Sequence, residues 1–222
     1  MPVSVEELRW AHAAFSSARM APYLAASGGD LAQAMRLYWW NVEASAAFYG
    51  PLHCLEVTLR NALHTQLYGR HGRPDWWANA RLTDEGRRSV EQARSKLRRR
   101  AMRDPSPDAI VAELTFGFWV SLLSHRADRH FWVPALHRAF PGYSGPRREL
   151  HAEMYEALQF RNRVMHHEPI HHRVLEKDHE RVFRLLGHLS PECVVLAREL
   201  DRIPEVLRRR DDVCAGRLRL SF

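Results

Sequence analysis

Residues 108–124, DAIVAELTFGFWVSLLS, are the stretch that decides the fold. Their large apolar residues fall on every side of a helix with a 3.6-residue repeat, not on one face. A surface helix keeps a polar face toward water, so we expect this helix to lie in the core. The apolar residues are Ile110, Val111, Leu114, Phe116, Phe118, Trp119, Leu122 and Leu123.

Helical patterns flank this stretch on both sides, separated by turn-forming residues. Upstream, they predict helices over residues 3–20, 31–49, 52–68 and 83–103. We expect breaks before Pro22 and at Gly50–Pro51, because proline lacks the N–H that a helix interior uses. Downstream, they predict a short element over 129–140 and helices over 147–167, 175–189 and 191–208.

The whole chain is predicted to be all-α. Only the short tail over residues 217–222 alternates as a strand would. No linker is long enough to separate two domains, so a single domain over residues 1–222 is expected. Hydrophobic residues make up 45% of the chain, which is enough for a globular core.

The charge balance points to an anionic partner. The 222 residues include 33 Lys plus Arg against 26 Asp plus Glu, a net charge of +7. Arginine supplies nearly all of the positive charge, because the only lysines are Lys96 and Lys177. The guanidinium fork matches phosphate, so nucleic acid is a first candidate. The alternative is a solvated arginine-rich surface, because net charge bears on association and not on fold.

The cysteines and the N-terminal residues bear on the compartment. The cysteine count is odd and no C-x-x-C occurs, so neither a disulfide framework nor a cysteine zinc site is expected. The first residues are charged and lack the apolar run of a signal peptide. No run approaches the ~18 apolar residues of a membrane span. We expect a cytoplasmic protein. The cysteines are Cys54, Cys193 and Cys214.

Residues 161–172, RNRVMHHEPIHH, contain two overlapping motifs. From His167 to His171 they spell H-E-x-x-H, in which a helix presents two zinc ligands one turn apart and the glutamate acts as general base. Pro169 disfavours this interpretation, because proline removes a backbone bond and forces the preceding residue out of the helical region. The helix is expected to end at about His167. A looser metal site remains open, with the ligands His166, His167, His171 and His172.

The second motif runs from Arg161 through Asn162 to His166 and suits a metal-free ribonuclease. RNA carries its own nucleophile, the 2′-OH. Its cleavage needs a proton-transfer group near that hydroxyl or the leaving oxygen, and positive charge on the phosphorane. At ~100° per residue, Asn162 lies ~100° and His166 ~140° round the helix from Arg161. The alternative is a helix C-terminus at which histidine favours the dipole and the others bond locally.

Two further groups are candidates for a supporting role. Glu56, Arg60 and His64 recur every four residues on one helix face, and they form either the opposite wall of a cleft or a surface ion pair. A basic run either follows an RNA backbone or is simply solvated. The run consists of Arg94, Lys96, Arg98, Arg99, Arg100 and Arg103.

The stretches RNRVMHHEPI, GDLAQAMRLYWWNVEASAAFYGPLHCLEVTLRNALH and AELTFGFWVSLL resemble a known family. They are similar to the Abi-like (abortive infection, AbiD/AbiF-type) bacterial proteins of the HEPN superfamily, across about residues 28–205. The resemblance implies a HEPN-like helical bundle with additional N-terminal helices. It also implies RNA cleavage without metal or other cofactor, by a motif that maps onto Arg161 and His166, with Asn162 after the arginine.

The resemblance also implies partners and a biological role. It implies a homodimer whose two motifs form one cleft, an RNA substrate, a cognate antitoxin, and a function in phage defence or as a toxin. His167 satisfies the motif at one residue longer, so the choice between His166 and His167 stays open. The leading hypothesis is an endoribonuclease. The alternatives are a non-catalytic RNA-binding or regulatory dimer and a metal-dependent hydrolase.

Overall fold

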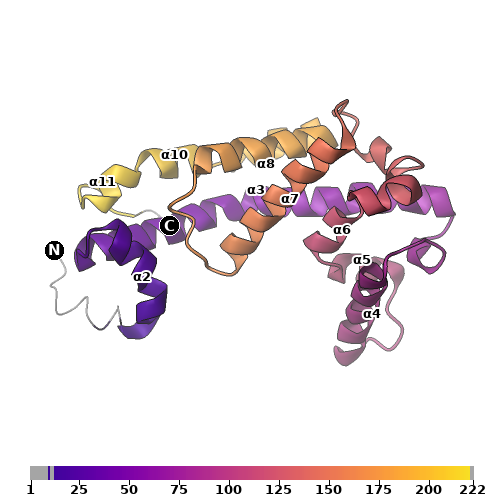
Figure 1. Cartoon of the computed structure of the whole chain (residues 1–222), viewed down its shortest axis with the longest axis horizontal. Coiled ribbons are helices and arrows are strands. Elements are labelled where there is room, and N and C mark those ends of the chain that lie inside the picture. The colour runs from indigo at the N-terminus through magenta and orange to yellow at the C-terminus, as the bar shows by residue number, and fades with distance from the viewer. Residues whose placement is uncertain (1–9, 11–12, 221–222) are drawn as a thin grey trace. The chain divides into compact units, whose positions relative to one another are not determined.

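The computed structural model describes residues 10 and 13–220, and these are all-α, as predicted (Figure 1). No strand occurs among them, and residues 217–220 of the tail are irregular. Residues 221 and 222 of the tail lie outside the described part. The chain forms two compact units. The first unit consists of residues 1–51, 160–180 and 199–222, and the second of residues 52–159 and 181–198. The predicted single domain stays a prediction.

The first unit is built mainly from six helical segments of the described residues. They are α2 (Ser17–Ala26), the first half of α3 (Leu31–His71), the end of α7 (Arg147–Met165), the start of α8 (Leu175–Leu189), α10 (Ile203–Arg208) and α11 (Arg210–Cys214). Trp40 is buried at its centre and donates from Nε1 to the Val206 carbonyl at 3.0 Å. The rings of Phe48 and Phe160 meet edge to face, with centroids 4.7 Å apart. Aromatic packing therefore fixes the end of α7 against α3 within this unit.

The second unit holds the remaining helices. They are the second half of α3, η1 (Trp76–Ala78), α4 (Asp84–Arg99), α5 (Pro107–Glu113), α6 (Phe116–Ser121), η2 (His125–Ala127), η3 (Asp128–Trp132), η4 (Leu136–Ala139), most of α7, the end of α8 (Leu175–Leu189) and α9 (Pro191–Glu199). Its core is aromatic: Trp76 packs against Trp77, Phe118, Trp119 and Phe131.

Two proline breaks predicted from the sequence are wrong. Pro22 lies inside α2, and α3 continues through Gly50 and Pro51 as one helix of 41 residues. A proline removes only one backbone bond of the helix, at a cost of ~3 kcal/mol. Burial of apolar side chains on both sides of Pro51 offsets that cost. These side chains include Trp40, Ala44, Ala47, Phe48, Leu52, Leu55, Leu59 and Leu63. Half of the predicted helix over residues 3–20, namely residues 3–9, 11 and 12, lies outside the described residues.

The stretch at residues 108–124 is buried as predicted, but it forms two helices. Thr115 separates α5 from α6, and its hydroxyl caps α6 by accepting the Phe118 N–H at 3.2 Å. A similar break divides the predicted helix over 191–208, where the Asp201 carboxylate accepts the Ile203 N–H at 3.1 Å. In both places a side-chain oxygen binds a backbone N–H where the continuous apolar pattern predicted an unbroken helix. The element predicted over 129–140 consists of η3 and η4, whereas α8 has the predicted bounds.

Candidate functional site

The C-terminal end of α7 carries the R-N-x3-H motif. The helix ends at Met165, and the His167 backbone has φ 57°, in the left-handed region. The N–H of His167 donates to the Val164 carbonyl at 3.2 Å, and that of Glu168 to the Arg163 carbonyl at 2.8 Å. These paired bonds form a Schellman motif, which a proline commonly follows. The predicted end at about His167 therefore agrees with the structure to within two residues.

The loop that follows is fixed by side chains from other helices of the first unit. Asn41 is buried on α3, and its Oδ1 accepts the N–H groups of Ile170 at 2.7 Å and His171 at 3.0 Å. Arg19 of α2 donates from Nη1 to the His167 carbonyl. The N–H and carbonyl groups of the loop after α7 are thereby paired within the protein, as buried backbone groups require. These contacts therefore hold the C-terminal end of α7 in place.

His171 is part of this anchor. Its side chain is buried, and its ring lies 4.9 Å from that of Tyr23 of α2. Burial, and then the neighbouring His172 and Arg210, lower the pKa of His171 to about 4. Burial raises the pKa of Tyr23 to about 12. Both side chains are therefore neutral at pH 7 and serve packing.

The geometry bears directly on the H-E-x-x-H motif. His167 is exposed in the turn that ends α7, whereas His171 is buried beyond Pro169. No helix connects the two residues, so one helical face does not present both imidazoles. Within residues 10 and 13–220, no group of three or more His, Cys, Asp or Glu side chains is placed to hold a metal ion.

Arg161, Asn162 and His166, the residues of the motif, lie in the last turns of α7 and directly after it. Arg161 and Asn162 are half-buried, and Arg161 Nη1 lies 3.5 Å from Asn162 Oδ1. The His166 N–H donates to the Asn162 carbonyl at 2.9 Å, so His166 keeps the helical i+4 relation to Asn162. Its imidazole is exposed. His167 has left the helical path, which makes His166 the better candidate for the motif's histidine.

This arrangement has the chemical groups for phosphodiester chemistry. An exposed imidazole transfers protons near neutral pH, and a guanidinium offers several donors to phosphate oxygens. The Asn162 amide oxygen lies 3.5 Å from Arg161 Nη1, at the long limit of a hydrogen bond. Cleavage by the 2′-OH requires a proton-transfer group and a cation near the reacting phosphate, and within the motif His166 and Arg161 carry these groups.

The candidates on α3 belong to the second unit, whereas the motif belongs to the first. Burial lowers the pKa of His64, and its Nδ1 accepts a hydrogen bond from Trp76 Nε1 at 3.1 Å. Arg60 donates from Nε to Asn61 Oδ1 at 3.2 Å. The bond from Trp76 gives His64 a structural role within its own unit. A wall of Glu56, Arg60 and His64 opposite the motif stays a prediction.

The basic run lies at the end of α4 and beyond it, in the second unit. Lys96 and Arg100 both pair with Glu113 of α5, and Arg94 lies 3.9 Å from Glu91. Arg98, Arg99 and Arg103 are exposed. Half of the run therefore lies within 4 Å of carboxylates, although Lys96 and Arg100 remain exposed.

Sequence reasoning missed the residues that anchor the helix end. Asn41 was readable in part, since it is an amide within the apolar segment LYWWNVEASAAF (residues 37–48). A buried polar residue needs a partner, and this one serves a loop 129 residues away. Nothing local in the sequence pairs it with Ile170 or His171.

No family model, curated protein or solved structure matches the chain. Among the described residues, no helix combines the length and the apolar character needed to cross a membrane.

Proposed function

We propose that this protein is an endoribonuclease that cleaves RNA without a metal ion. His166 transfers a proton at the 2′-OH or at the leaving oxygen, Arg161 stabilises the phosphorane, and Asn162 orients Arg161. The observation that carries the proposal is the position of these three residues in the last turns of α7 and directly after it, at an anchored helix end. The net charge of +7 adds long-range attraction for the RNA.

The reaction needs only groups of the protein and of the RNA. The 2′-oxygen attacks the adjacent phosphorus as its proton leaves, a new P–O2′ bond forms, and the P–O5′ bond breaks. The departing 5′-oxygen takes up a proton. The products carry a 2′,3′-cyclic phosphate and a 5′-OH. The Arg161 guanidinium stabilises the negative charge that develops on the phosphorane oxygens.

The resemblance to Abi-like HEPN proteins extends the proposal to biology. A homodimer would bring two copies of the motif into one cleft, in the cytoplasm of a bacterium. A toxin or abortive-infection role in phage defence, restrained by a protein or RNA antitoxin, follows from the same resemblance. These assignments rest on the motif RNRVMHHEPI and its companion stretches.

Cleavage of RNA in EDTA tests the proposal. The wild type should cut and leave cyclic phosphate ends, which mass spectrometry of the products identifies. Arg161→Ala and His166→Ala should each lower the rate about 10²- to 10⁴-fold. Arg163→Ala is the matched control, because Arg163 pairs with Glu168 at 3.2 Å instead of Asn162. A requirement for added metal, or normal cleavage by both motif variants, would refute the assignment.

A second candidate is an RNA-binding or regulatory dimer without catalysis. The basic charge favours it as much as it favours the nuclease, because phosphate attraction needs no reaction. Salt-sensitive RNA binding, with no cleavage at any protein concentration, would identify this function.

A further inference from the structure

A large hollow lies in the second unit, whereas the R-N-x3-H motif belongs to the first. Its volume is about 740 Å³, within the ~300–1,000 Å³ usual for ligand sites. It is lined by the start of α4, by α6 and the segment after it, and by His151, Tyr155 and Leu158 of α7. All of these residues belong to the second unit, so one compact body forms the hollow.

The hollow has an apolar floor and a basic rim. Buried Leu82, Val120, Phe131 and Leu158 contribute apolar surface. The rim has three exposed arginines, two near the start of α4 and one in η2: Arg81, Arg88 and Arg126. An apolar surface with polar groups around it suits a ligand that combines a flat apolar part and charges. The charges of such a ligand would be negative.

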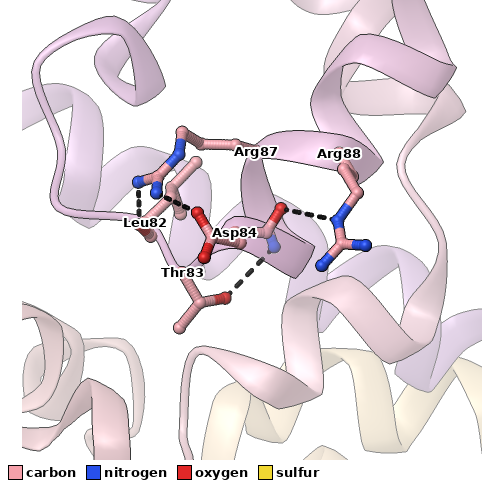
Figure 2. Close-up of polar contacts among 6 residues, drawn as sticks. Leu82, Thr83, Asp84, Arg87 and Arg88 are labelled. Atoms are coloured by element: carbon pink, nitrogen blue, oxygen red, sulfur yellow. Dashed lines mark hydrogen bonds and ion pairs between the residues drawn. The ribbon is translucent and has the colours of Figure 1, made fainter.

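The start of α4 shows how the rim remains basic despite its acidic residues (Figure 2). Thr83 caps the helix, and its Oγ1 accepts the Gly86 N–H at 3.1 Å. Arg87, which does not line the hollow, donates to the Leu82 carbonyl and to Asp84 Oδ1, so it neutralises Asp84.

Arg88 is held differently from Arg87. Its Nε donates to the Asp84 carbonyl at 3.2 Å, and its terminal nitrogens point away from that bond in Figure 2. The backbone at the start of α4 thus binds the Nε of Arg88 and leaves its two terminal amino groups out of this bond. Among the described residues, no cation lies within 4 Å of the carboxylate of Glu85, the other acid of this rim. Its negative charge disfavours an anionic ligand, so a variant that removes this charge provides a second test of the hollow.

Aromatic groups of α7 complete the rim. Tyr155 is 48% exposed, and its ring centroid lies 6.4 Å from that of His151, one helical turn earlier. Burial and the nearby Arg147 lower the pKa of His151, so its ring is neutral at pH 7. An exposed aromatic ring beside arginines is the combination with which proteins bind single-stranded nucleic acid.

We propose that this hollow binds the bases and phosphates of a single RNA strand. Arg81, Arg88 and Arg126 contact phosphates, and a base stacks on Tyr155 above the apolar floor. RNA as the physiological strand rests on the proposed ribonuclease function. Tyr155 and Arg161 belong to the same helix, α7, so the hollow and the motif share one element.

Binding of a short unstructured oligonucleotide with 2′-O-methyl riboses tests this site. The modified strand has no free 2′-OH, so it is bound but not cut. Tyr155→Ala should raise the dissociation constant about 5- to 100-fold through lost stacking. The double variant Arg88→Gln with Arg126→Gln should raise it about tenfold or more. Glu85→Gln should tighten binding.

Salt dependence separates a phosphate contact from a merely structural effect. Each lost contact should reduce the slope of log K against log salt by about 0.7, so the double variant should lose about 1.4. The matched control is Arg138→Gln, an exposed arginine of η4 that does not line the hollow. Its dissociation constant should lie within about twofold of the wild-type value. The slope of log K against log salt should fall by at most about 0.7, the value of one phosphate contact. Unchanged melting temperatures should show that the exposed variants still fold.

Three outcomes overturn the assignment. The hollow variants bind like the wild type, Arg138→Gln weakens binding as much as they do, or a free mononucleotide competes as well as the oligonucleotide. The failures of the two proposals are distinguishable. Binding at the hollow without any cleavage of ordinary RNA refutes the nuclease alone, whereas normal binding and cleavage by the hollow variants refute the hollow alone.

Discussion

The ends of α4 and α7 have the same local structure but different surroundings. Each ends in a Schellman motif with a residue other than glycine in the left-handed region: Ala101 with φ 65° after α4, and His167 with φ 57° after α7. Each is also rich in basic residues. The amino-acid composition of a helix end therefore does not distinguish a candidate site from a solvated cap.

The difference lies in what holds the chain after the helix. Beyond α7, Asn41 accepts two backbone N–H groups, Arg19 donates to a carbonyl, and His171 packs against Tyr23. Beyond α4, residues 101–104 are exposed, and the end of the helix is held by the pairing of Lys96 and Arg100 with Glu113. A buried anchor fixes the backbone, which is the condition for precise chemistry.

The largest expected effect comes from breaking the anchor at Asn41. Asn41→Leu leaves the N–H groups of Ile170 and His171 buried without an acceptor, at ~1–3 kcal/mol each. Urea denaturation should show a loss of about 4 kcal/mol in the free energy of unfolding. Asn41→Asp keeps an oxygen acceptor and should lose less. A leucine variant as stable as the wild type would show that the loop is not held in this way.

The next effect is a pH dependence from His171. Its pKa is about 4 in the folded protein and near 6.5 when unfolded, so between these values the unfolded chain binds the extra proton. Stability should therefore fall as pH drops from about 6.5 to 4, by roughly 3 kcal/mol at most from this group. His171→Phe keeps a ring against Tyr23 but does not titrate. Denaturation of both proteins across this range should show a flatter profile for the variant.

The contrast between local structure and contacts with distant residues also explains which parts of the fold and of the site the sequence predicts. Local signals are enough to predict the all-α class, the bounds of α8 and the end of α7. The spacing of apolar residues and the effect of Pro169 on the helix each involve only a few neighbouring residues. The continuity of α3 is not local, since burial along its whole length outweighs the signal at Gly50–Pro51. The motif is readable because its residues are adjacent in sequence. Its anchor and the basic rim depend on residues far apart in the chain.

A smaller effect is expected at α4, where the anchor is more exposed. Glu113→Gln removes the charge that pairs with Lys96 and Arg100, whose side chains are 51% and 61% exposed. Solvent screens such pairs, so the loss should be about 1 kcal/mol and should shrink in high salt. Denaturation at low and high salt measures both. A loss as large as that of Asn41→Leu would mean that the two helix ends are equally anchored.

The smallest expected effect concerns the left-handed residue that follows both helices. A left-handed backbone costs a non-glycine residue ~1–2 kcal/mol, and glycine avoids this cost but loses more entropy on folding. His167→Gly and Ala101→Gly should each stabilise the protein by about 0.5 kcal/mol, whereas His167→Ala should not. Thermal denaturation of the three variants measures this. Equal gains at both positions would assign the strain to the cap itself. A gain at Ala101 alone would mean that the contacts of Asn41 and Arg19 hold His167 in place whichever residue occupies it.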